Sequence, residues 1–470
     1  MNQLVWFRSD LRVLDNHALS AAMSSGPTLA VYITSPAQWR QHDDAPAKVD
    51  FWLRNLACLR QSLDGLGVPL LIIEVDLWRD IPAVLENLCH LHAVSTLHFN
   101  DEYGVNEARR DDAVEQLLET RSVTVRRHVD QVLFKPGSVL TGSGGYFKVF
   151  SQFKKVCNER LHHAPPSVLP IPRAQAPLPV ESDPVPTRVS GFEPPSERIR
   201  AFWPAGEEAV SKRLEIFANE DIGDYLRARD IPSEDGTSRM SAYLAAGVVS
   251  PRQCLQAALR ANHGELDSGN QGAVTWISEL LWRDFYKHIL VGYPRVSMGR
   301  AFRPETERMG WERDENALQA WKDGRTGFPI IDAAMRQMQA LGWMHNRLRM
   351  LTAMFLSKNL LIDWREGERW FMQHLVDGDL SANNGGWQWS ASTGTDSVPY
   401  FRIFNPITQS QHFDPRGDFI REWLPELQGL DAKRIHHGVA ADLFAGGEYP
   451  APIVDLRESR ARALAAFKNL

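Results

Sequence analysis

The sequence predicts two domains of different fold class: a doubly wound, parallel-sheet α/β domain over residues 1–134 and a larger all-α domain over residues 206–470. Three observations predict this division. Short apolar runs alternate with helix-period segments in the first 134 residues, as they do in parallel α/β sheets. Ten of the 28 prolines fall within 165–195, where they interrupt regular structure. From about residue 206 onward, the apolar residues recur at helical spacing.

The strands of the α/β domain are expected where apolar runs are short and bounded by turn residues. They are LVWF (4–7), TLAVYI (28–33), VPLLIIEV (68–75), VSTLHF (94–99) and VTVRRHV (123–129), with helix-period segments such as 48–65 and 106–119 between them. Ligands of such sheets bind beyond the carboxyl ends of the strands, so the loops after residues 7, 33 and 99 are candidate binding loops. Neither G-x-G-x-x-G nor G-x-x-x-x-G-K-[ST] occurs there, which excludes the two common phosphate-binding fingerprints.

A linker is expected over residues 135–205, and its proline-rich part should cross the surface as extended chain. The helical domain follows it, with helices expected near 207–218, 250–262, 272–291, 314–323, 328–341, 344–361 and 364–376. The sequence therefore describes an α/β domain, a wrapping linker and a larger helical domain.

Composition and charge exclude several classes of protein. The 470 residues are 43% hydrophobic, which is typical of globular proteins, and no run of eighteen apolar residues predicts a membrane span. The four cysteines lack CxxC spacing, which disfavours a zinc knuckle or disulfide framework, and no signal peptide is visible, so a reducing cytoplasm is expected. Residues 1–134 hold 12 basic and 18 acidic residues, so the net charge of −6 lies there. The neutral remainder leaves room for a local basic face.

The segment WISELLWRDFYKH (276–288) carries a polar and aromatic stripe on one helical face. Its members, three or four residues apart, are Glu279, Trp282, Arg283 and Tyr286. A carboxylate, an indole, a guanidinium and a phenol in one stripe are unusual in a core and indicate a binding surface. A solvated amphipathic face is the alternative.

The segment WMHNRLRM (343–350) places Asn346, Arg349 and Met350 on one helical face and turns Arg347 aside. A binding face is one interpretation. The alternative is an arginine that pairs with a distant carboxylate for stability alone.

Two further segments have the chemistry of a polar binding site. In DGDLSANNGGWQW (377–389), carboxylates can accept from N–H or hydroxyl groups, and glycines allow close approach of a ligand. Asp377 and Asp379 lack a third ligand at suitable spacing, so no metal site is expected. GTSRMS (236–241) precedes a helix and offers hydroxyl and backbone N–H donors suited to a pyrophosphate. An ordinary helix cap is the alternative there.

Four blocks of the helical half match one family in its own order. The chain resembles DNA photolyases of the cryptochrome/photolyase family, most closely the bacterial class I enzymes that act on cyclobutane pyrimidine dimers. The blocks are TGFPIIDAAMRQM (326–338), WMHNRLRM (343–350), KNLLIDWREGERWF (358–371) and DGDLSANNGGWQWSASTGTD (377–396), and the resemblance extends back to LVWFRSDLRVLDN (4–16). It implies an FAD-binding helical domain and a lyase in which light drives electron transfer from reduced FAD to dimers in UV-damaged DNA.

The resemblance implies a set of FAD contacts. They are Tyr225, Thr237, Ser238, Arg239, Met240, Ser241, Trp276, Arg349, Asp377, Gly378, Asp379 and Asn383. The run 237–241 would bind the phosphates, and Arg349 would pair with Asp377 beside the flavin ring. Asn383 would face flavin N5, where an amide suits a reduced, anionic flavin. Plant and animal cryptochromes typically carry Asp or Cys at that position.

The resemblance also implies a lesion pocket and DNA contacts. They comprise Glu279, Trp282, Arg283, Tyr286, Asn346, Arg347, Met350, Trp389 and Arg402. Photolyases are among the enzymes that flip their target out of the duplex, so indole walls from Trp282 and Trp389 would replace the lost stacking. Protonated Glu279 or the Asn346 amide would stabilise negative charge on a pyrimidine carbonyl. Glu279, Asn346 and Asn383 are therefore the expected catalytic residues. Photolyases for (6-4) lesions carry a His pair in place of Asn346 and Met350, which favours cyclobutane dimers here.

Two accessory systems follow from the same resemblance. Trp311, Trp364 and Trp387 match the family's tryptophan chain, which carries an electron from the surface to oxidised flavin; Trp321 is a branch of it or, as we favour, a core residue. His42, Asn106 and Glu107 match contacts to a methenyltetrahydrofolate antenna. For Glu107, capping of the helix 106–119 is the alternative. Folate-binding members often carry Lys where this chain has Met298, so a deazaflavin is the alternative antenna.

Two rival functions remain, namely a photosensory cryptochrome and a photolyase specific for single strands. Asn383 and the complete lesion pocket favour a repair enzyme. The expected form is a cytoplasmic monomer that binds damaged DNA, but neither a membrane nor a metal.

Overall fold

The computed structural model describes residues 2–437 and 449–470. The chain forms two compact units, each assembled from segments distant in sequence. Unit 1 comprises Met1–Gly223, Ser238–Pro294 and Val376–Asp379, and unit 2 comprises Asp224–Thr237, Arg295–Leu375 and Leu380–Leu470. Unit 1 thus contains the α/β fold together with part of the helical region, and unit 2 is built from helices. The boundaries predicted at residues 134 and 205 stay predictions.

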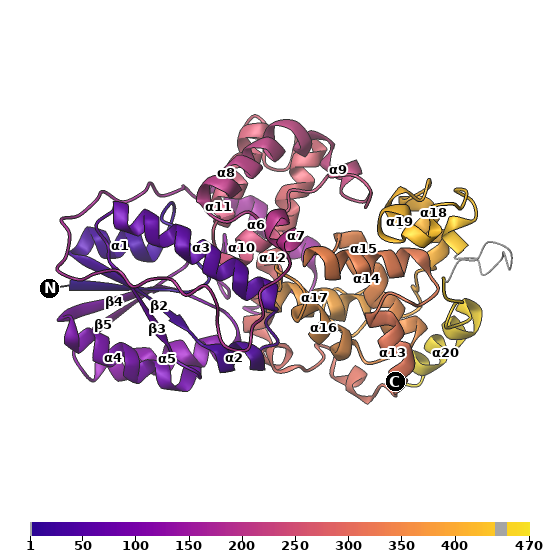
Figure 1. The fold of residues 1–470 in the computed structure, drawn as a ribbon, viewed down its shortest axis with the longest axis horizontal. Coiled ribbons are helices and arrows are strands. Elements are labelled where there is room, and N and C mark those ends of the chain that lie inside the picture. The colour runs from indigo at the N-terminus through magenta and orange to yellow at the C-terminus, as the bar shows by residue number, and fades with distance from the viewer. Residues whose placement is uncertain (1, 438–448) are drawn as a thin grey trace. The chain divides into compact units, whose positions relative to one another are not determined.

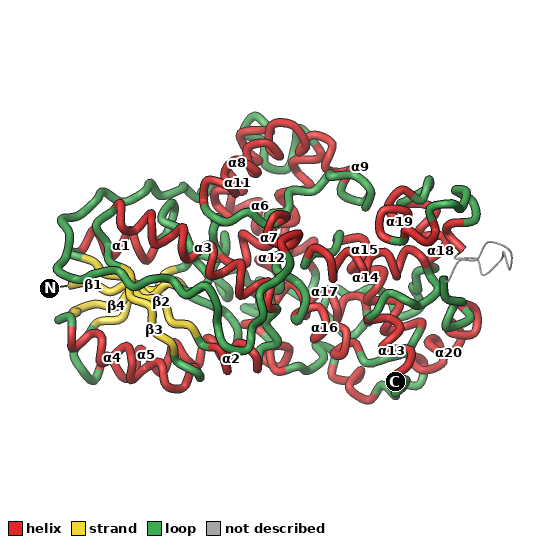
Figure 2. The backbone as a smooth tube through the Cα atoms, viewed as in Figure 1, coloured by secondary structure: helices red, strands yellow, loops and turns green. Residues whose placement is uncertain are grey.

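A five-stranded parallel sheet forms the centre of the α/β fold. Its strands are β1 (Asn2–Phe7), β2 (Thr28–Thr34), β3 (Leu70–Glu74), β4 (Val94–Asn100) and β5 (Thr124–His128), in the order β3-β2-β1-β4-β5. Helices α1 (His17–Ser25) and α3 (Pro46–Gly65) cover one face, and α4 (Ile81–Leu91) and α5 (Val105–Glu119) cover the other (Figures 1 and 2). The structure confirms the predicted doubly wound sheet and the helical remainder. The topological switch point lies between β1 and β4, where the chain turns from one side of the sheet to the other.

The apolar runs form strands because both faces of the sheet are covered. Leu4 and Trp6 of β1, two residues apart, point to the same face and join a core cluster with Leu85 of α4 and Val114 of α5. Each such fully buried side chain contributes about 1.5–3 kcal/mol. These contacts fix the register that positions the loops at the carboxyl edge of the sheet.

The predicted extended linker covers the exposed edge of the sheet at β3. Residues 164–188 form neither helix nor strand, and they follow this edge strand. The Asp183 N–H donates to Leu70 O at 2.8 Å, and the Asp183 carboxylate accepts from Ile72 N at 2.8 Å. Ser182 Oγ accepts from Leu70 N at 3.1 Å. These bonds satisfy groups of an edge strand that would otherwise be open to pairing with another chain.

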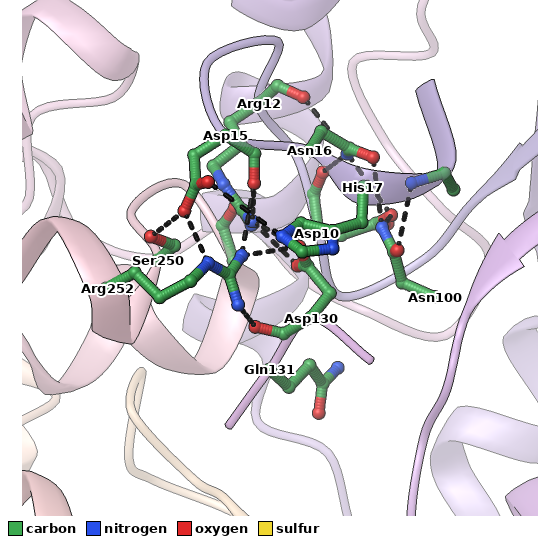
Figure 3. Close-up of polar contacts among 12 residues, drawn as sticks. Asp10, Arg12, Asp15, Asn16, His17, Asn100, Asp130, Gln131, Ser250 and Arg252 are labelled. Carbon is green, nitrogen blue, oxygen red and sulfur yellow. Dashed lines mark hydrogen bonds and ion pairs between the residues drawn. The ribbon is translucent and has the colours of Figure 1, made fainter. Parts of the chain in front are cut away.

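A second connection within unit 1 is a buried cluster of ion pairs, which we call the clamp: Arg12, Asp15, Asp130, Ser250 and Arg252. Figure 3 shows the side chains of the clamp converging. Arg12 Nη2 lies 2.7 Å from Asp130 Oδ2, and Arg252 Nη2 lies 2.8 Å from Asp130 Oδ1. Arg252 Nε and Ser250 Oγ both donate to Asp15 Oδ2, at 2.8 and 2.5 Å. Burial alone would raise the pKa of Asp130, but the two guanidinium groups hold it below its ordinary value. The clamp explains the segment LVWFRSDLRVLDN, whose charged residues tie the α/β fold to the helix that begins at Pro251.

The remaining helices include one in each of the seven ranges predicted from apolar spacing, and several more that this spacing did not predict. Those of unit 1 are α2 (Pro36–Gln41), α6 (Phe150–His163), α7 (Glu197–Phe202), α8 (Glu207–Ile216), α10 (Ser241–Ala246), α11 (Pro251–Ala261) and α12 (Gln271–Gly292). Those of unit 2 are α9 (Tyr225–Ala228), α13 (Glu315–Lys322), α14 (Pro329–Leu341), α15 (Asn346–Met354), α16 (Trp364–Met372), α17 (Leu380–Ser390), α18 (Pro406–Phe413), α19 (Asp418–Trp423) and α20 (Leu456–Lys468). Helices α6 and α7 both lie inside the range 135–205 that was expected to be linker. Within residues 2–437 and 449–470, no helix has both the length and the apolar character needed to cross a membrane.

Candidate functional site

Helix α12 of unit 1 presents the predicted polar and aromatic stripe. From residue 276 to 290, every residue is buried except Glu279, Trp282, Arg283 and Tyr286, which are half-buried. The spacing of three and four residues therefore selects one accessible face on a helix that is otherwise core. The Arg283 guanidinium donates to the carbonyl oxygens of Gln131 and, at 3.3 Å, Leu244. If Arg283 contacts DNA as predicted, its guanidinium does so while these two carbonyl oxygens hold it in place.

The predicted phosphate-binding run has part of its residues in unit 1, next to α12. Ser238 Oγ accepts from Trp276 Nε1 at 3.2 Å and from Met240 N at 3.3 Å, so two of the expected FAD contacts, Ser238 and Trp276, lie together. Arg239 has a left-handed backbone (φ +52°), a conformation that non-glycine residues rarely adopt outside functional or tightly packed sites. Its guanidinium lies 4.5 Å from the centroid of the Phe202 ring. Ser241 begins α10.

The acidic turn Val376–Asp379 also belongs to unit 1. Asp379 Oδ2 lies 3.0 Å from Lys287 Nζ on α12, while Asp377 and Gly378 are buried. Burial lowers the pKa of Lys287, and Asp379 is its counter-ion. The sequence analysis missed Lys287, although it lies one turn beyond Arg283 on the helix already singled out.

In unit 2, α17 carries Asn383 in a fixed orientation. Asn383 Nδ2 donates to the backbone oxygen of Glu368 at 3.0 Å, which leaves the amide oxygen and the second N–H of Nδ2 as groups that can bind a ligand. Asn384 Nδ2 donates to Glu368 Oε1 at 2.8 Å, and burial raises the pKa of Glu368 to about 7. Glu368 was not predicted, because its relation to these two amides comes from the packing of α16 on α17.

Helix α15 of unit 2 begins at Asn346, within the block WMHNRLRM (343–350). Arg347 Nη2 lies 2.7 Å from Asp230 Oδ1, and its guanidinium lies 4.4 Å from the centroid of the Phe413 ring. Arg349 Nε donates to Met344 O at 2.8 Å. Asn346 is exposed, whereas Met350 is half-buried. The expected partner of Arg349 is Asp377, which belongs to unit 1, so that ion pair stays a prediction. Tyr225 and Thr237 belong to unit 2, so their expected role in one FAD site with the residues of unit 1 also stays a prediction.

The predicted tryptophan chain lies in unit 2. Trp387 and Trp364 are buried, and Trp311 is half-buried. Trp387 packs edge-on against Phe371, with ring centroids 4.9 Å apart, and a Cβ on Gly367 would lie 2.0 Å from Trp387 Cη2. The glycine in WREGERWF therefore makes room for this indole.

Packing alone holds the Trp387 ring among the described residues, because none of them accepts a hydrogen bond from its Nε1. Trp321 lies 6.0 Å from Trp387, is fully buried, and donates from Nε1 to Thr352 O at 3.2 Å. Its burial and its hydrogen bond are features of a core residue. Its short distance to Trp387 also fits the alternative, in which Trp321 is a branch of the electron-transfer chain.

Helix α17 and the segment that follows it carry the two remaining predicted DNA contacts, Trp389 and Arg402. Trp389 is half-buried, and its carbonyl oxygen accepts from Val398 N at 3.3 Å. The Arg402 carbonyl accepts from Lys358 Nζ at 3.1 Å, which ties the segment carrying Arg402 to the block KNLLIDWREGERWF. Burial lowers the pKa of Lys358 to about 7.

The predicted antenna residues lie at the carboxyl edge of the sheet in unit 1. His42 directly follows α2, which comes after β2, and Asn106 and Glu107 lie in the first turn of α5, which comes after β4. Asn106 Nδ2 and Gln38 Nε2 each lie 3.1 Å from His42 Nε2, and burial lowers the pKa of His42, which favours its neutral ring. The Trp78 ring lies 4.7 Å from the His42 ring. Gln38 lies one helical turn before His42 on α2, and Trp78 reaches the site from the segment after β3; neither was predicted.

Glu107 has geometry that fits both of its interpretations. A Cβ on Gly104 would lie 2.0 Å from Glu107 Oε2, so the carboxyl group folds back over the residue that precedes α5, as in a helix cap. Burial, together with the negative charge of Glu102, raises the pKa of Glu107 to about 7. A carboxyl group with a raised pKa at the carboxyl edge of the sheet, where ligands of such folds bind, is a candidate ligand contact.

Comparison with known proteins agrees with this architecture. Residues 3–172 match the family model described as DNA photolyase, and residues 276–469 match the FAD binding domain of DNA photolyase. The deoxyribodipyrimidine photo-lyase of Salmonella typhimurium is 46% identical over 469 residues, covering 99% of this chain and 98% of the relative. Among solved structures, a class III photolyase from Agrobacterium tumefaciens superposes with a TM-score of 0.88 at 34% identity, covering 100% of this chain and 97% of that one. A Synechocystis cryptochrome superposes with a TM-score of 0.87 at 27% identity, with 99% of each chain covered.

The fold and the matched domains place the chain in the class of flavin-binding photolyases and cryptochromes. Within that class, the chain belongs to the DNA photolyase family, as the sequence blocks predicted.

Proposed function

We propose that this protein is an enzyme that splits cyclobutane pyrimidine dimers in UV-damaged DNA under light, with reduced FAD as the electron donor. The observation that carries the proposal is the stripe on α12. Over residues 276–290 of this helix, all residues are buried except the half-buried Glu279, Trp282, Arg283 and Tyr286, and this stretch is within the part of the chain matched as an FAD-binding domain. Stability alone does not call for an accessible indole beside a carboxylate and a guanidinium.

The donors and acceptors present in each unit fit FAD. Ser238 Oγ already accepts two hydrogen bonds, so its own hydroxyl hydrogen is free to donate to a phosphate oxygen. The amide oxygen of Asn383 takes no part in the bond to Glu368 and can accept from an N–H group. The residues we propose to hold FAD are Tyr225, Thr237, Ser238, Arg239, Met240, Ser241, Trp276, Arg349, Asp377, Gly378, Asp379 and Asn383. When bound and reduced, FAD supplies the photoexcited electron that the chemistry requires.

The residues of the chain bind the lesion and stabilise its charge. Trp282 in unit 1 and Trp389 in unit 2 offer indole faces for a dimer that has lost its stacking in the duplex. Glu279 in its protonated form, or the exposed Asn346 amide, donates a hydrogen bond to a pyrimidine carbonyl oxygen that gains negative charge. Arg347 and Arg402 supply positive charge for the phosphates.

We further propose methenyltetrahydrofolate as the antenna. His42, Asn106 and Glu107 supply an amide and a carboxyl group around a neutral imidazole, which suits the hydrogen-bonding edge of a pterin. Met298 is exposed and offers no charge at the position where relatives often have Lys. A folate held without that charge should be lost readily on purification. A deazaflavin is the alternative, and its absorption at longer wavelength would distinguish it.

We also propose that the protein acts as a monomer in the cytoplasm. Its four cysteines, Cys58, Cys89, Cys157 and Cys254, are all free, as expected in a reducing compartment. Light scattering of the purified protein tests the monomer, since a dimer would double the mass.

The experiment that tests the function is repair of a defined substrate. Purified, reduced protein under near-ultraviolet or blue light should convert thymine dimers in duplex DNA to thymines and should leave them unchanged in the dark. The similarity to a cryptochrome structure supports two alternative functions: a blue-light photoreceptor and a photolyase specific for single strands. A photoreceptor would change its flavin spectrum under light without repair, and a single-strand enzyme would repair only the unpaired substrate.

A further inference from the structure

Trp282 of α12 is stacked face to face on a residue from the range expected to be linker. The ring centroids of Phe150 and Trp282 are 3.7 Å apart, with an interplanar angle of 13°. Phe150 is the first residue of α6 and is buried, whereas Trp282 is half-buried. One face of the indole is therefore covered by Phe150, and its accessible area lies on the other face and the edges.

The stack belongs to a layer of aromatic rings between α6 and α12, two helices that lie in contact in unit 1 (Figure 1). Phe150 and Phe153 both pack against Phe285, with centroid distances of 5.8 and 5.5 Å. Tyr286 lies 5.5 Å from Trp282 on the side of the stripe. Among the described residues, the other aromatic rings in contact with Trp282 are Phe285 and Tyr286 of its own helix, so Phe150 is the ring that fixes the tilt of the indole from outside α12.

The same segment is basic, in contrast to the acidic first 134 residues. Between residues 148 and 160 there are four basic side chains and one acidic one: Lys148, Lys154, Lys155, Arg160 and Glu159. Lys154 lies four residues after Phe150, hence on the same side of α6, and Lys155 is exposed. Among the described residues, neither Lys154 nor Lys155 forms an ion pair with a carboxylate. A positive charge thus lies one helical turn from the covered indole.

We propose that α6 is part of the DNA-binding surface: Phe150 positions Trp282 for stacking on the lesion, and Lys154 and Lys155 contact phosphates of the damaged strand. The proposal rests on the proposed function, because it takes Trp282 to be the lesion-stacking indole. Phe150 is a positioning residue that touches no substrate. The lysines add affinity that is independent of the lesion, whereas the stack adds preference for damaged over intact DNA.

The first test separates the stack from overall folding. Binding to a duplex with one thymine dimer and to the same duplex undamaged is measured for wild type, Phe150→Leu, Phe150→Tyr and Trp282→Ala. Phe150→Leu should lower the preference for damaged DNA by about five- to tenfold, and Phe150→Tyr, which keeps a six-membered ring, should stay within about twofold of wild type. FAD content and photoreduction of oxidised FAD should be unchanged in both variants. Equal loss of preference in the Leu and Tyr variants, or a loss of FAD, would overturn the positioning role.

The second test concerns the lysines. In Lys154→Gln/Lys155→Gln, the slope of log affinity against log salt should be shallower by about one to two, for damaged and intact duplex alike. Lys212, exposed on α8, provides the control: Lys212→Gln should leave the slope unchanged. An unaltered slope in the double variant would overturn the contact with phosphates.

The Trp282→Ala variant distinguishes failure of this proposal from failure of the proposed function. If wild type shows no preference for the dimer, or if Trp282→Ala keeps it, the lesion-stacking role itself is wrong. If Trp282→Ala loses the preference and Phe150→Leu keeps it, the role of α6 alone is wrong.

Discussion

The clamp and the stripe on α12 are both made of charged and polar side chains, yet their surroundings differ. In the clamp, Arg12, Asp130 and Arg252 are nearly or fully buried, and each carboxylate oxygen of Asp130 accepts from a guanidinium. On α12, Glu279 and Trp282 are half-buried within a helix whose neighbouring positions are core. A buried charge without its partner is costly, so the paired cluster serves stability. An accessible indole on a rigid, buried helix serves binding instead.

The largest effect is expected in the clamp. Asp130→Ala removes the carboxylate that the buried guanidinium groups of Arg12 and Arg252 share. The loss should lower the free energy of unfolding by about 3–5 kcal/mol. The pKa of Asp130 is held below its ordinary value, so this stabilisation is complete at neutral pH and is lost as the pH falls through the folded pKa. Urea denaturation measures it. The control is Arg227→Gln, which removes a surface ion pair and should leave the midpoint nearly unchanged. Equal effects of the two variants would contradict the distinction drawn here.

Trp387 combines a feature of each region: it is buried like the clamp, but among the described residues it is held by packing and not by a hydrogen bond from its Nε1. Trp387→Phe should nearly abolish photoreduction of oxidised FAD, while repair by chemically reduced enzyme persists. Trp321→Phe is the matched control, because Trp321 is equally buried and lies 6.0 Å from Trp387. Full photoreduction in the Trp387 variant would mean that the electron takes another route, and a loss in the Trp321 variant would make that residue a branch of the chain.

For Trp282 of the stripe, we expect a substitution to affect DNA binding strongly and stability only weakly. Trp282→Ala should weaken binding to a dimer-containing duplex by about 10- to 100-fold, the usual contribution of stacking one base on an aromatic ring. The unfolding midpoint should move much less than in Asp130→Ala, because the indole is half-buried. Titration of labelled duplex and a urea melt of the same preparation test this. A loss of stability comparable to that of the clamp variant would assign Trp282 to the core.

Glu107 tests whether a buried carboxyl group at the sheet edge serves structure or binding. Its pKa of about 7 means that the group is protonated below that pH and ionised above it. If the ionised form accepts from the pterin, folate affinity should fall as the pH drops below 7, by up to about tenfold per unit. Glu107→Ala should remove the near-ultraviolet band and its pH dependence, while repair by direct flavin excitation persists. A folate band unaffected by the substitution would leave Glu107 as a helix cap.

Arg347 is the intermediate case, paired as in the clamp but half-buried as on the stripe. Its ion pair with Asp230 competes with a phosphate for the same guanidinium. Arg347→Ala should weaken binding and reduce the salt slope by about one. Asp230→Asn should strengthen binding to intact duplex slightly, by about two- to threefold. A salt slope unchanged in Arg347→Ala would direct this residue to the base pocket.

The sequence predicted most of what depends on local spacing. The strands of the sheet were found because β1 and β2 are buried on both faces, and the stripe on α12 was found because its four residues are three or four apart. What it missed depends on contacts between elements far apart in the chain. Phe150 stacks on a residue 132 positions later, Asp230 in the turn after α9 pairs with Arg347 of α15, and Glu368 meets Asn383 through packing of α16 on α17. Helix α6 was also missed, because the whole range 135–205 was assigned to the linker although its proline-rich part begins only at residue 165.

The measurement that tests the account most directly is repair of a single thymine dimer in duplex DNA by the purified, reduced protein, with and without light. The account predicts conversion to two thymines under near-ultraviolet or blue light, none in the dark, and a strongly reduced yield in Trp282→Ala at subsaturating protein. Repair that proceeds equally in the dark, or no repair under light by protein that contains reduced FAD, would contradict it.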